Sequence, residues 1–181
     1  MGHKDRGLRP GRKDSGEGWE GVETLPMQES DLEEVLGIEA SSFSCPWTAE
    51  MFRQEFLTTP ISSCFVAKVR RRGSDAPVRD PGVLGYICCW VVWDEMQVAN
   101  LAVHPGWRRK GIGRLLMENA FQSGSQRGVR KVFLEVRASN SAAQDLYRGL
   151  GFEVVGIRKG YYQFPPEDAY VMALEMPRKG C

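Results

Sequence analysis

The chain has 181 residues, which is enough for one well-buried domain and short for two. Its formal net charge is +1 and no basic stripe runs through the part expected to fold, so nucleic acid is not expected as a direct partner. No apolar run approaches the roughly 18 residues that a membrane span needs, and residues 1–20 lack the apolar core of a secretory signal.

The composition of the chain ends predicts the domain limits, and the cysteines indicate the chemistry and setting to expect. Residues 1–20 are polar and rich in glycine, with five Lys or Arg among the first thirteen residues, and we interpret them as a disordered tail. We expect one domain over 21–177 and a short C-terminal tail at 178–181. The five cysteines show no metal-binding spacing and the chain has only two histidines, so no metal site is expected. Unpatterned cysteines of this kind suit a reducing, cytoplasmic setting.

The first half of the domain is predicted to alternate between strands and helices. A strand is expected over 22–27, followed by a helix capped by Ser30 that carries apolar residues to Ile38. After the turn Cys45-Pro46-Trp47, a second helix is expected from Thr48 to Leu57. Strands at 62–69, 83–93 and 96–103 then form an antiparallel meander, with a polar connection over 70–82.

The second half continues the pattern. We expect a helix from Gly111 to about Arg127, a strand over 131–137 and a helix over 141–149. Two last strands, at 153–158 and 168–176, are expected to flank a loop over 159–166. The elements together predict an α/β fold in which one mixed sheet carries helices on both faces.

The run from Asn100 to Gly113 carries the clearest functional signal. An apolar strand ends at His104-Pro105, and Gly111-x-Gly113 then opens a helix. Glycines let the backbone approach a ligand closely, and the free N–H groups of a helix start bind anions. Basic side chains surround this turn: Arg108, Arg109, Lys110 and Arg114. The run therefore predicts a site for a phosphate-bearing cofactor.

Two common phosphate-binding motifs do not fit this run. The Gly-x-x-x-x-Gly-Lys-Ser/Thr loop of nucleoside triphosphatases does not occur in the chain. A dinucleotide fingerprint needs a third small residue, and Leu116 stands at that position.

The pattern Arg108-x-x-Gly111-x-Gly113 instead resembles the pyrophosphate loop of the GCN5-related N-acetyltransferase (GNAT) family. A second block, which runs from Asn140 through Ala143, Leu146 and Tyr147 to Leu150-Gly151-Phe152, is similar to that family's downstream signature. The resemblance implies acetyl-CoA as co-substrate, no metal, and a single, largely antiparallel mixed sheet of about six to seven strands.

The resemblance also assigns cofactor contacts. Backbone groups of the strand before the turn would hold the pantetheine arm, and backbone N–H groups of the turn would hold the pyrophosphate. The implied cofactor residues are Leu101, Ala102, Val103, Arg108, Arg109, Lys110, Gly111, Ile112, Gly113, Arg114 and Asn140.

Two residues are candidates for acid–base catalysis. Glu135 lies in the middle of an apolar strand, where a carboxylate needs either a partner, such as Arg137 or Lys131, or a chemical task. The resemblance implies that Glu135 is the general base. Tyr147, on the following helix, is either a core aromatic or, by the resemblance, the acid that protonates the departing thiolate.

The chemistry leaves more than one acceptor open. An α-amino group, with a pKa near 8, is roughly a fifth neutral at physiological pH, whereas a lysine is neutral in about one molecule per thousand. A modest base such as Glu135 therefore suffices for an α-amine, but lysine and small amines remain open.

Further residues resemble the branch of the family that acetylates the N-terminal alanine of a small-subunit ribosomal protein (RimI-type). These are Cys45-Pro46-Trp47-Thr48, the pair Tyr161-Tyr162 and Glu167-Asp168-Ala169. The resemblance implies that Trp47, Tyr161 and Tyr162 wall a slot for a peptide N terminus. Two alternatives remain: an acetyltransferase acting on a small amine or lysine, and a non-catalytic acyl-CoA-binding module.

Overall fold

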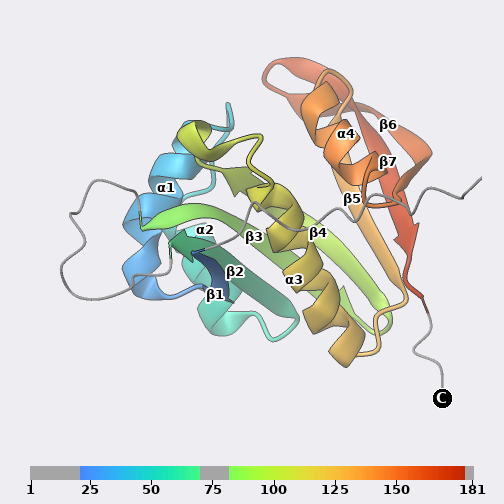
Figure 1. Ribbon diagram of the computed structural model, residues 1–181. Coiled ribbons are helices and arrows are strands. Elements are labelled where there is room, and N and C mark those ends of the chain that lie inside the picture. The colour runs from blue at the N-terminus through green and yellow to red at the C-terminus, as the bar shows by residue number, and fades with distance from the viewer. Residues whose placement is uncertain (1–20, 70–81, 178–181) are drawn as a thin grey trace, which may run out of the picture.

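The computed structural model describes residues 21–69 and 82–177 (Figure 1). The expected tails at 1–20 and 178–181 lie outside the described residues, as does nearly all of the expected connection at 70–82.

A single mixed sheet organises the described residues, as the sequence predicts. Its strand order is β1-β2-β3-β4-β5-β7-β6, and neighbours pair antiparallel except β4 and β5, which pair parallel. The strands are β1 (Val22–Pro26), β2 (Ser62–Val69), β3 (Val83–Val92), β4 (Glu95–Val103), β5 (Lys131–Arg137), β6 (Glu153–Gln163) and β7 (Pro166–Glu175).

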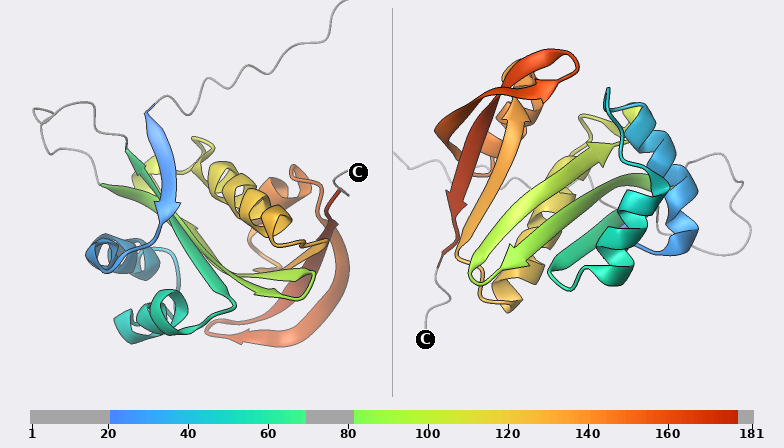
Figure 2. Two further views of the ribbon diagram at one scale, coloured as in Figure 1. Left: turned by 90° about the horizontal axis from the view of Figure 1, so that it is seen from below. Right: turned by 180° about the vertical axis from the view of Figure 1, so that it is seen from behind.

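Helices cover both faces of this sheet (Figure 2). One face carries α1 (Leu32–Ala40) and α2 (Ala49–Arg53), which continues as a π-helical turn (Gln54–Thr58); the other carries α3 (Ile112–Gln126) and α4 (Ser141–Arg148). Successive side chains of a strand point to opposite faces, so β3 is buried on both sides. Tyr86 and Cys88 pack with α1 and α2, whereas Ile87 and Cys89 pack with α3. None of the helices in the described residues is long and apolar enough to cross a membrane.

The sheet opens between its two central strands. The parallel ladder of β4 and β5 covers only Glu95–Val98 and Lys131–Leu134. Beyond it the two strands diverge, so that β5, β7 and β6 lean away from β3 and β4 with α4 beside them (Figure 1). Opposite this point, the register of β3 and β4 shifts between Cys88 and Cys89, which marks a bulge. The opening exposes the last residues of β4 and of β5 to a common space.

Two local predictions are wrong. Ser30 does not cap the first helix: a 3₁₀ turn (Glu29–Asp31) precedes α1, and Gln28 and Asp31 form a capping box across that turn. The last two strands do not end at a loop over 159–166. They continue as a hairpin to Gln163 and Pro166, with irregular pairing between Arg158 and Tyr162 and Gly160 in a left-handed conformation at φ 59°. This irregularity lets the strand carry a glycine and two tyrosines without ending.

Candidate active site

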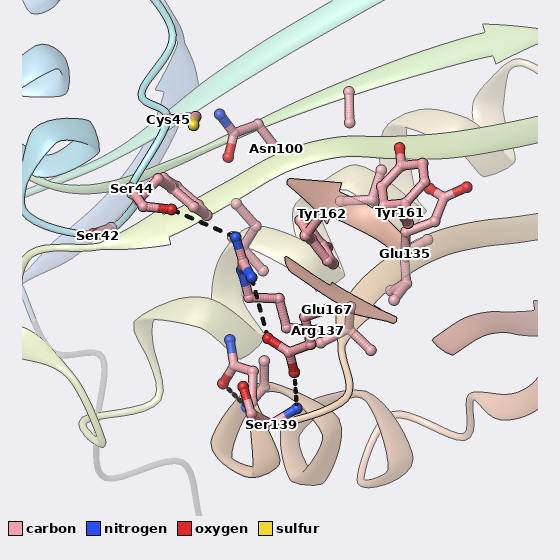
Figure 3. Close-up of a pocket in the computed structure, with 18 of the residues that line it drawn as sticks. Ser42, Ser44, Cys45, Asn100, Glu135, Arg137, Ser139, Tyr161, Tyr162 and Glu167 are labelled. Carbon is pink, nitrogen blue, oxygen red and sulfur yellow. Dashed lines mark hydrogen bonds and ion pairs between the residues drawn. The ribbon is translucent and has the colours of Figure 1, made fainter. Parts of the chain in front are cut away.

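A pocket of about 580 Å³ lies where β4 and β5 diverge (Figure 3). Glu135 and Tyr147, predicted from sequence as base and acid, both line it. So do five residues predicted to contact cofactor or acceptor: Leu101, Asn140, Trp47, Tyr161 and Tyr162. The splayed sheet therefore brings together side chains that lie more than a hundred residues apart in the chain.

The first of these side chains is Glu135, in the middle of β5. Its side chain is 13% exposed and its two oxygens have different partners. Arg158 of β6 pairs with Oε1 at 2.9 Å, and Gln97 of β4 donates to Oε2 at 2.5 Å. The ion-pair partners considered from sequence are not used, because Lys131 pairs with Glu175 and Arg137 pairs with Glu167. The contacts fix the orientation of this carboxylate at the pocket wall.

Tyr147 lies in the last turn of α4 and is 7% exposed. It packs against Phe152 in the core and also lines the pocket. Burial, followed by the nearby Tyr162 and Cys89, raises the pKa of Tyr147 well above its ordinary value of about 10. The phenol therefore keeps its proton at neutral pH, so it can donate one.

The predicted pyrophosphate turn combines a left-handed backbone with the start of a helix. Arg109 and Gly111 are left-handed, at φ 63° and 81°, and α3 begins directly after them at Ile112. The first N–H groups of an α-helix have no intrahelical acceptor, so this end of α3 presents free donors. Gly113 is buried, and a Cβ there would lie 3.0 Å from Leu146 of α4. The turn therefore combines free backbone donors with a close approach of α3 to α4.

Not all of the basic side chains near this turn are free. Arg108 donates from Nε to the carbonyl of Val103 at 3.1 Å and from Nη2 to Ser42 Oγ at 2.9 Å. Arg114 donates to the carbonyl of Gly149 at 2.8 Å and pairs with Glu118 at 3.5 Å. In the described residues, these two arginines thus tie the turn to α4 and to the segment after α1.

The two remaining polar residues predicted to contact the cofactor, Lys110 and Asn140, have different surroundings. The Lys110 ammonium lies 4.4 Å from the ring centroid of Trp107. Asn140 caps α4, since its side chain accepts a hydrogen bond from Ala143 N at 3.1 Å, and it lines the pocket.

The end of β4 presents its backbone unevenly to the opening. The Ala102 carbonyl lies against Gly85 of β3, where a Cβ would approach it to 2.8 Å. Backbone groups alternate along a strand, so those of Leu101 and Val103 point toward the open edge. The Val103 carbonyl is taken by Arg108, and Leu101 lines the pocket. Leu101 is therefore the best placed of the three predicted strand residues to pair with an extended ligand arm.

Three aromatic side chains from two parts of the chain also line the pocket. Trp47 comes from the segment between α1 and α2, whereas Tyr161 and Tyr162 come from the β6–β7 hairpin. The two tyrosine rings meet edge to face with centroids 5.1 Å apart. Burial, with the nearby Tyr161 next in effect, raises the pKa of Tyr162 to about 12. Tyr161 and Tyr162 thus give the pocket an aromatic wall on the side of the β6–β7 hairpin (Figure 3).

Sequence reasoning missed a buried polar cluster beside Trp47. Glu39, in α1, is only 1% exposed and accepts hydrogen bonds from Trp47 N, Tyr86 Oη and Asn100 Nδ2. Glu39 and Asn100 both line the pocket. The available signal was position: Glu39 stands four residues after Val35, on the apolar face of the helix.

Metal binding has no support in the side chains: residues 21–69 and 82–177 contain no group of three or more His, Cys, Asp or Glu that could hold an ion.

The comparisons with known proteins agree with this geometry. The sequence model of the Acetyltransferase (GNAT) family matches residues 32–152. A putative ribosomal protein bS18-alanine N-acetyltransferase of Bacillus subtilis is 36% identical over 146 residues, which is 81% of this chain and 90% of that protein. The bS18-alanine N-acetyltransferase of Salmonella typhimurium is 32% identical over 82% of this chain and 93% of its own length.

Solved structures of acetyltransferases are also similar to this chain. The crystal structure of the ribosomal-protein-S18-alanine N-acetyltransferase from Escherichia coli superimposes with a TM-score of 0.73 at 31% identity, covering 88% of this chain and 96% of that one. Arabidopsis thaliana NAA60 in complex with a bisubstrate analogue shares the fold, with a TM-score of 0.75 at 20% identity over 86% of this chain and 99% of its own.

The chain belongs to the GNAT family of acetyltransferases. Its relatives that act on ribosomal protein bS18 are similar to it over most of their length. The family resemblance and the fold expected from sequence are thereby confirmed, and acetyl-CoA is the co-substrate of this family.

Proposed function

We propose that this protein transfers an acetyl group from acetyl-CoA to the N-terminal α-amine of a protein, most specifically the N-terminal alanine of the small-subunit ribosomal protein bS18. The observation that carries the proposal is the pocket at the divergence of β4 and β5, which Glu135 and Tyr147 line together with Trp47, Tyr161 and Tyr162. The bS18-modifying relatives, which cover most of the chain, support the choice of acceptor and a cytoplasmic setting.

The proposed reaction is a direct transfer. Acetyl-CoA supplies a thioester, whose diphosphate fits the turn from Arg108 to Arg114 and whose arm fits the open edge at Leu101. Glu135 takes the proton that the amine loses, directly or through a water, as the new C–N bond forms. Tyr147 gives its proton to the sulfur as the C–S bond breaks, so that coenzyme A leaves as a thiol.

Several features of the site favour an α-amine over a polycation. Glu135 is already paired with Arg158, and Glu167 and Asp168 are paired with Arg137 and Lys159. A pocket for a polyamine needs carboxylates that are free to meet several positive charges. Glu39, the other carboxylate of the pocket, is surrounded by hydrogen-bond donors.

Release of the coenzyme A thiol tests the proposal directly. We expect turnover with a peptide that begins with alanine and carries the bS18 N-terminal sequence, and mass spectrometry should place the added acetyl group on the α-amine. The same peptide with a blocked N terminus, a lysine peptide and spermidine are the controls. Faster turnover with spermidine or lysine would favour the other acceptor classes, and binding of acetyl-CoA without any turnover would favour a non-catalytic module.

A further inference from the structure

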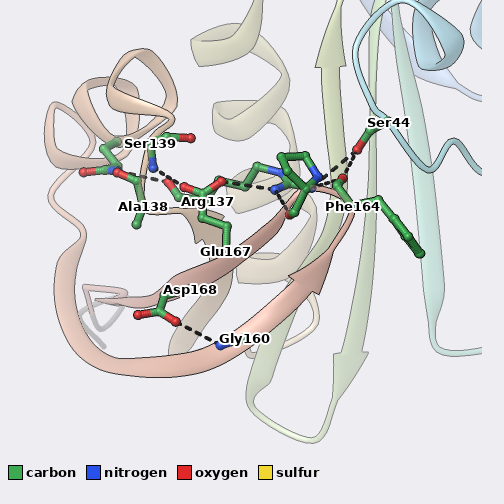
Figure 4. A network of polar contacts seen from close by, with 10 residues as sticks. Ser44, Arg137, Ala138, Ser139, Gly160, Phe164, Glu167 and Asp168 are labelled. Atoms are coloured by element: carbon green, nitrogen blue, oxygen red, sulfur yellow. Dashed lines mark hydrogen bonds and ion pairs between the residues drawn. The ribbon is translucent and has the colours of Figure 1, made fainter.

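Arg137, the last residue of β5, lies among three segments that surround the acceptor side of the pocket (Figure 4). These are the β6–β7 turn, the segment after α1 and the residues just before α4. It lies two residues after Glu135, so both side chains stand on the same face of the strand. The side chain is 24% exposed and lines the pocket.

The guanidinium group bridges the β6–β7 turn and the segment after α1. Nη2 donates to the carbonyl of Phe164 at 2.9 Å and reaches Ser44 Oγ at 3.4 Å, while Nη1 donates to the carbonyl of Pro165 at 3.2 Å. Ser44 in turn donates directly to the Phe164 carbonyl. A planar guanidinium with several donors in a fixed fork can join such acceptors at once, which the single ammonium of lysine cannot do with the same geometry.

Two further contacts connect this junction to the rest of the site. Glu167 pairs with Arg137 at 3.1 Å and accepts a hydrogen bond from Ser139 N, next to the cap of α4. The Arg137 guanidinium also lies 4.0 Å from the ring centroid of Tyr162, so the cation covers one face of the aromatic wall. Backbone and side-chain donors at Ser139, followed by Arg137, lower the pKa of Glu167, which keeps the ion pair charged.

We infer that Arg137 is a positioning residue that latches the β6–β7 turn to the segment between α1 and α2 and thereby closes the acceptor side of the pocket. It touches neither the phosphate turn nor Glu135 in the described contacts of the chain, so its effect falls on acceptor binding. The inference rests on the proposed function, because it assigns the latch to the same peptide slot.

Steady-state kinetics on the full chain separate this role from catalysis and from cofactor binding. With an alanine-initiated peptide as the varied substrate, we expect Arg137→Ala to raise the KM for peptide about tenfold or more. The KM for acetyl-CoA and kcat should change by less than about threefold. Arg137→Lys keeps the charge but not the fork, so it should recover only part of the loss, and Ser44→Ala should show a smaller rise in the same constant.

A control variant and a second measurement complete the test. Arg53→Ala removes an arginine of α2 that pairs with Glu29 and Glu50 and does not line the pocket, so it should leave all three constants unchanged. Hydrogen exchange without acceptor should show faster exchange at 42–47 and 160–167 in Arg137→Ala and not in Arg53→Ala. This measurement does not depend on activity.

The outcomes are distinct. An unchanged KM for peptide, or unchanged exchange in both segments, would overturn the latch. A loss confined to kcat or to the KM for acetyl-CoA would overturn it in favour of a role in chemistry or cofactor binding. Failure of the wild-type protein to acetylate the peptide would instead reject the proposed function, and the exchange measurement would still decide whether Arg137 holds the two segments together.

Discussion

Glu135 and Tyr147 differ in their surroundings in a way that matches opposite proton-transfer roles. The carboxylate contacts a cation and an amide donor, whereas the phenol is buried in an apolar core and also lines the pocket. A pair of titratable groups whose environments differ in this way is the usual arrangement for one base and one acid.

Removing either proton-transfer group should slow the chemical step. We expect Glu135→Gln and Tyr147→Phe each to lower kcat by about 10² to 10⁴-fold, because each variant keeps the shape but loses the proton acceptor or donor. Calorimetry should show that acetyl-CoA affinity is nearly unchanged in both. Wild-type turnover in either variant would remove that residue from the mechanism.

The buried carboxylate of Glu39 should matter for stability. Glu39→Leu leaves Trp47 N, Tyr86 Oη and Asn100 Nδ2 without their acceptor, which should cost about 3 kcal/mol or more of unfolding free energy. Glu39→Gln keeps one acceptor oxygen and should cost less. Urea denaturation measures both, with Glu33→Leu on the exposed face of α1 as the control. A loss in Glu33→Leu as large as in Glu39→Leu would contradict this account.

Among the elements, α3 is flanked by a left-handed glycine at each end. Its first turn follows left-handed Gly111 and offers free N–H groups, and its last turn leads into left-handed Gly128. The two glycines have nearly the same φ, 81° and 83°, so they carry the same conformational demand but lie at opposite ends of the helix.

This symmetry provides a matched test of the phosphate turn. Gly111→Val and Gly128→Val should each destabilise the fold by about 1–3 kcal/mol, because a β-branched residue is strained at positive φ. Only Gly111→Val should also weaken acetyl-CoA binding, by about tenfold or more in calorimetry. Equal weakening in both variants would indicate a general loss of structure, and no weakening in Gly111→Val would refute the assignment of the turn.

The β6–β7 hairpin shows where sequence reasoning ended. Tyr161 and Tyr162 are predicted from their motif to wall the acceptor slot, and they line the pocket. The sequence around them predicts a loop, because Gly160 and Pro165-Pro166 are turn residues, but the structure has a strand there. Pairing of Tyr162 with Glu167 and the contacts of Arg137 to the turn hold the hairpin together, and such long-range partners have no local signal.

Over the whole molecule, the sequence pattern predicts the described fold, but it does not predict the ion-pair and hydrogen-bond partners of the charged residues in the site. Apolar alternation and the two motifs predict the mixed sheet, its helices and the positions of Glu135 and Tyr147 along it. The partners of Glu135 come from β4 and β6, and those of Glu39 from β3, β4 and the turn before α2. Choosing among several charged residues requires knowing which strands are neighbours, which residue spacing alone does not give.

The pH dependence of the reaction should reflect both the acceptor amine and the burial of Tyr147 in the fold. Only the neutral amine attacks, so kcat/KM for an alanine-initiated peptide should rise through pH 8, near the ordinary pKa of an α-amine. In the proposed mechanism Tyr147 acts in its protonated form. Because burial raises its pKa above the ordinary value of about 10, its ionisation should remove activity only at a higher pH. We therefore expect a rise from pH 6 to 9 and a plateau to about pH 10.

Rate measurements in constant-ionic-strength buffers test this profile, with Tyr147→Phe as the control. The variant should show the same rise at a much lower rate, since the rise belongs to the amine. A fall in wild-type activity with a midpoint below pH 10 that disappears in Tyr147→Phe would show that the phenol ionises more easily than its burial permits. Tyr147 would then sit in a wetter or more positively charged site than the packing of α4 against Phe152 provides.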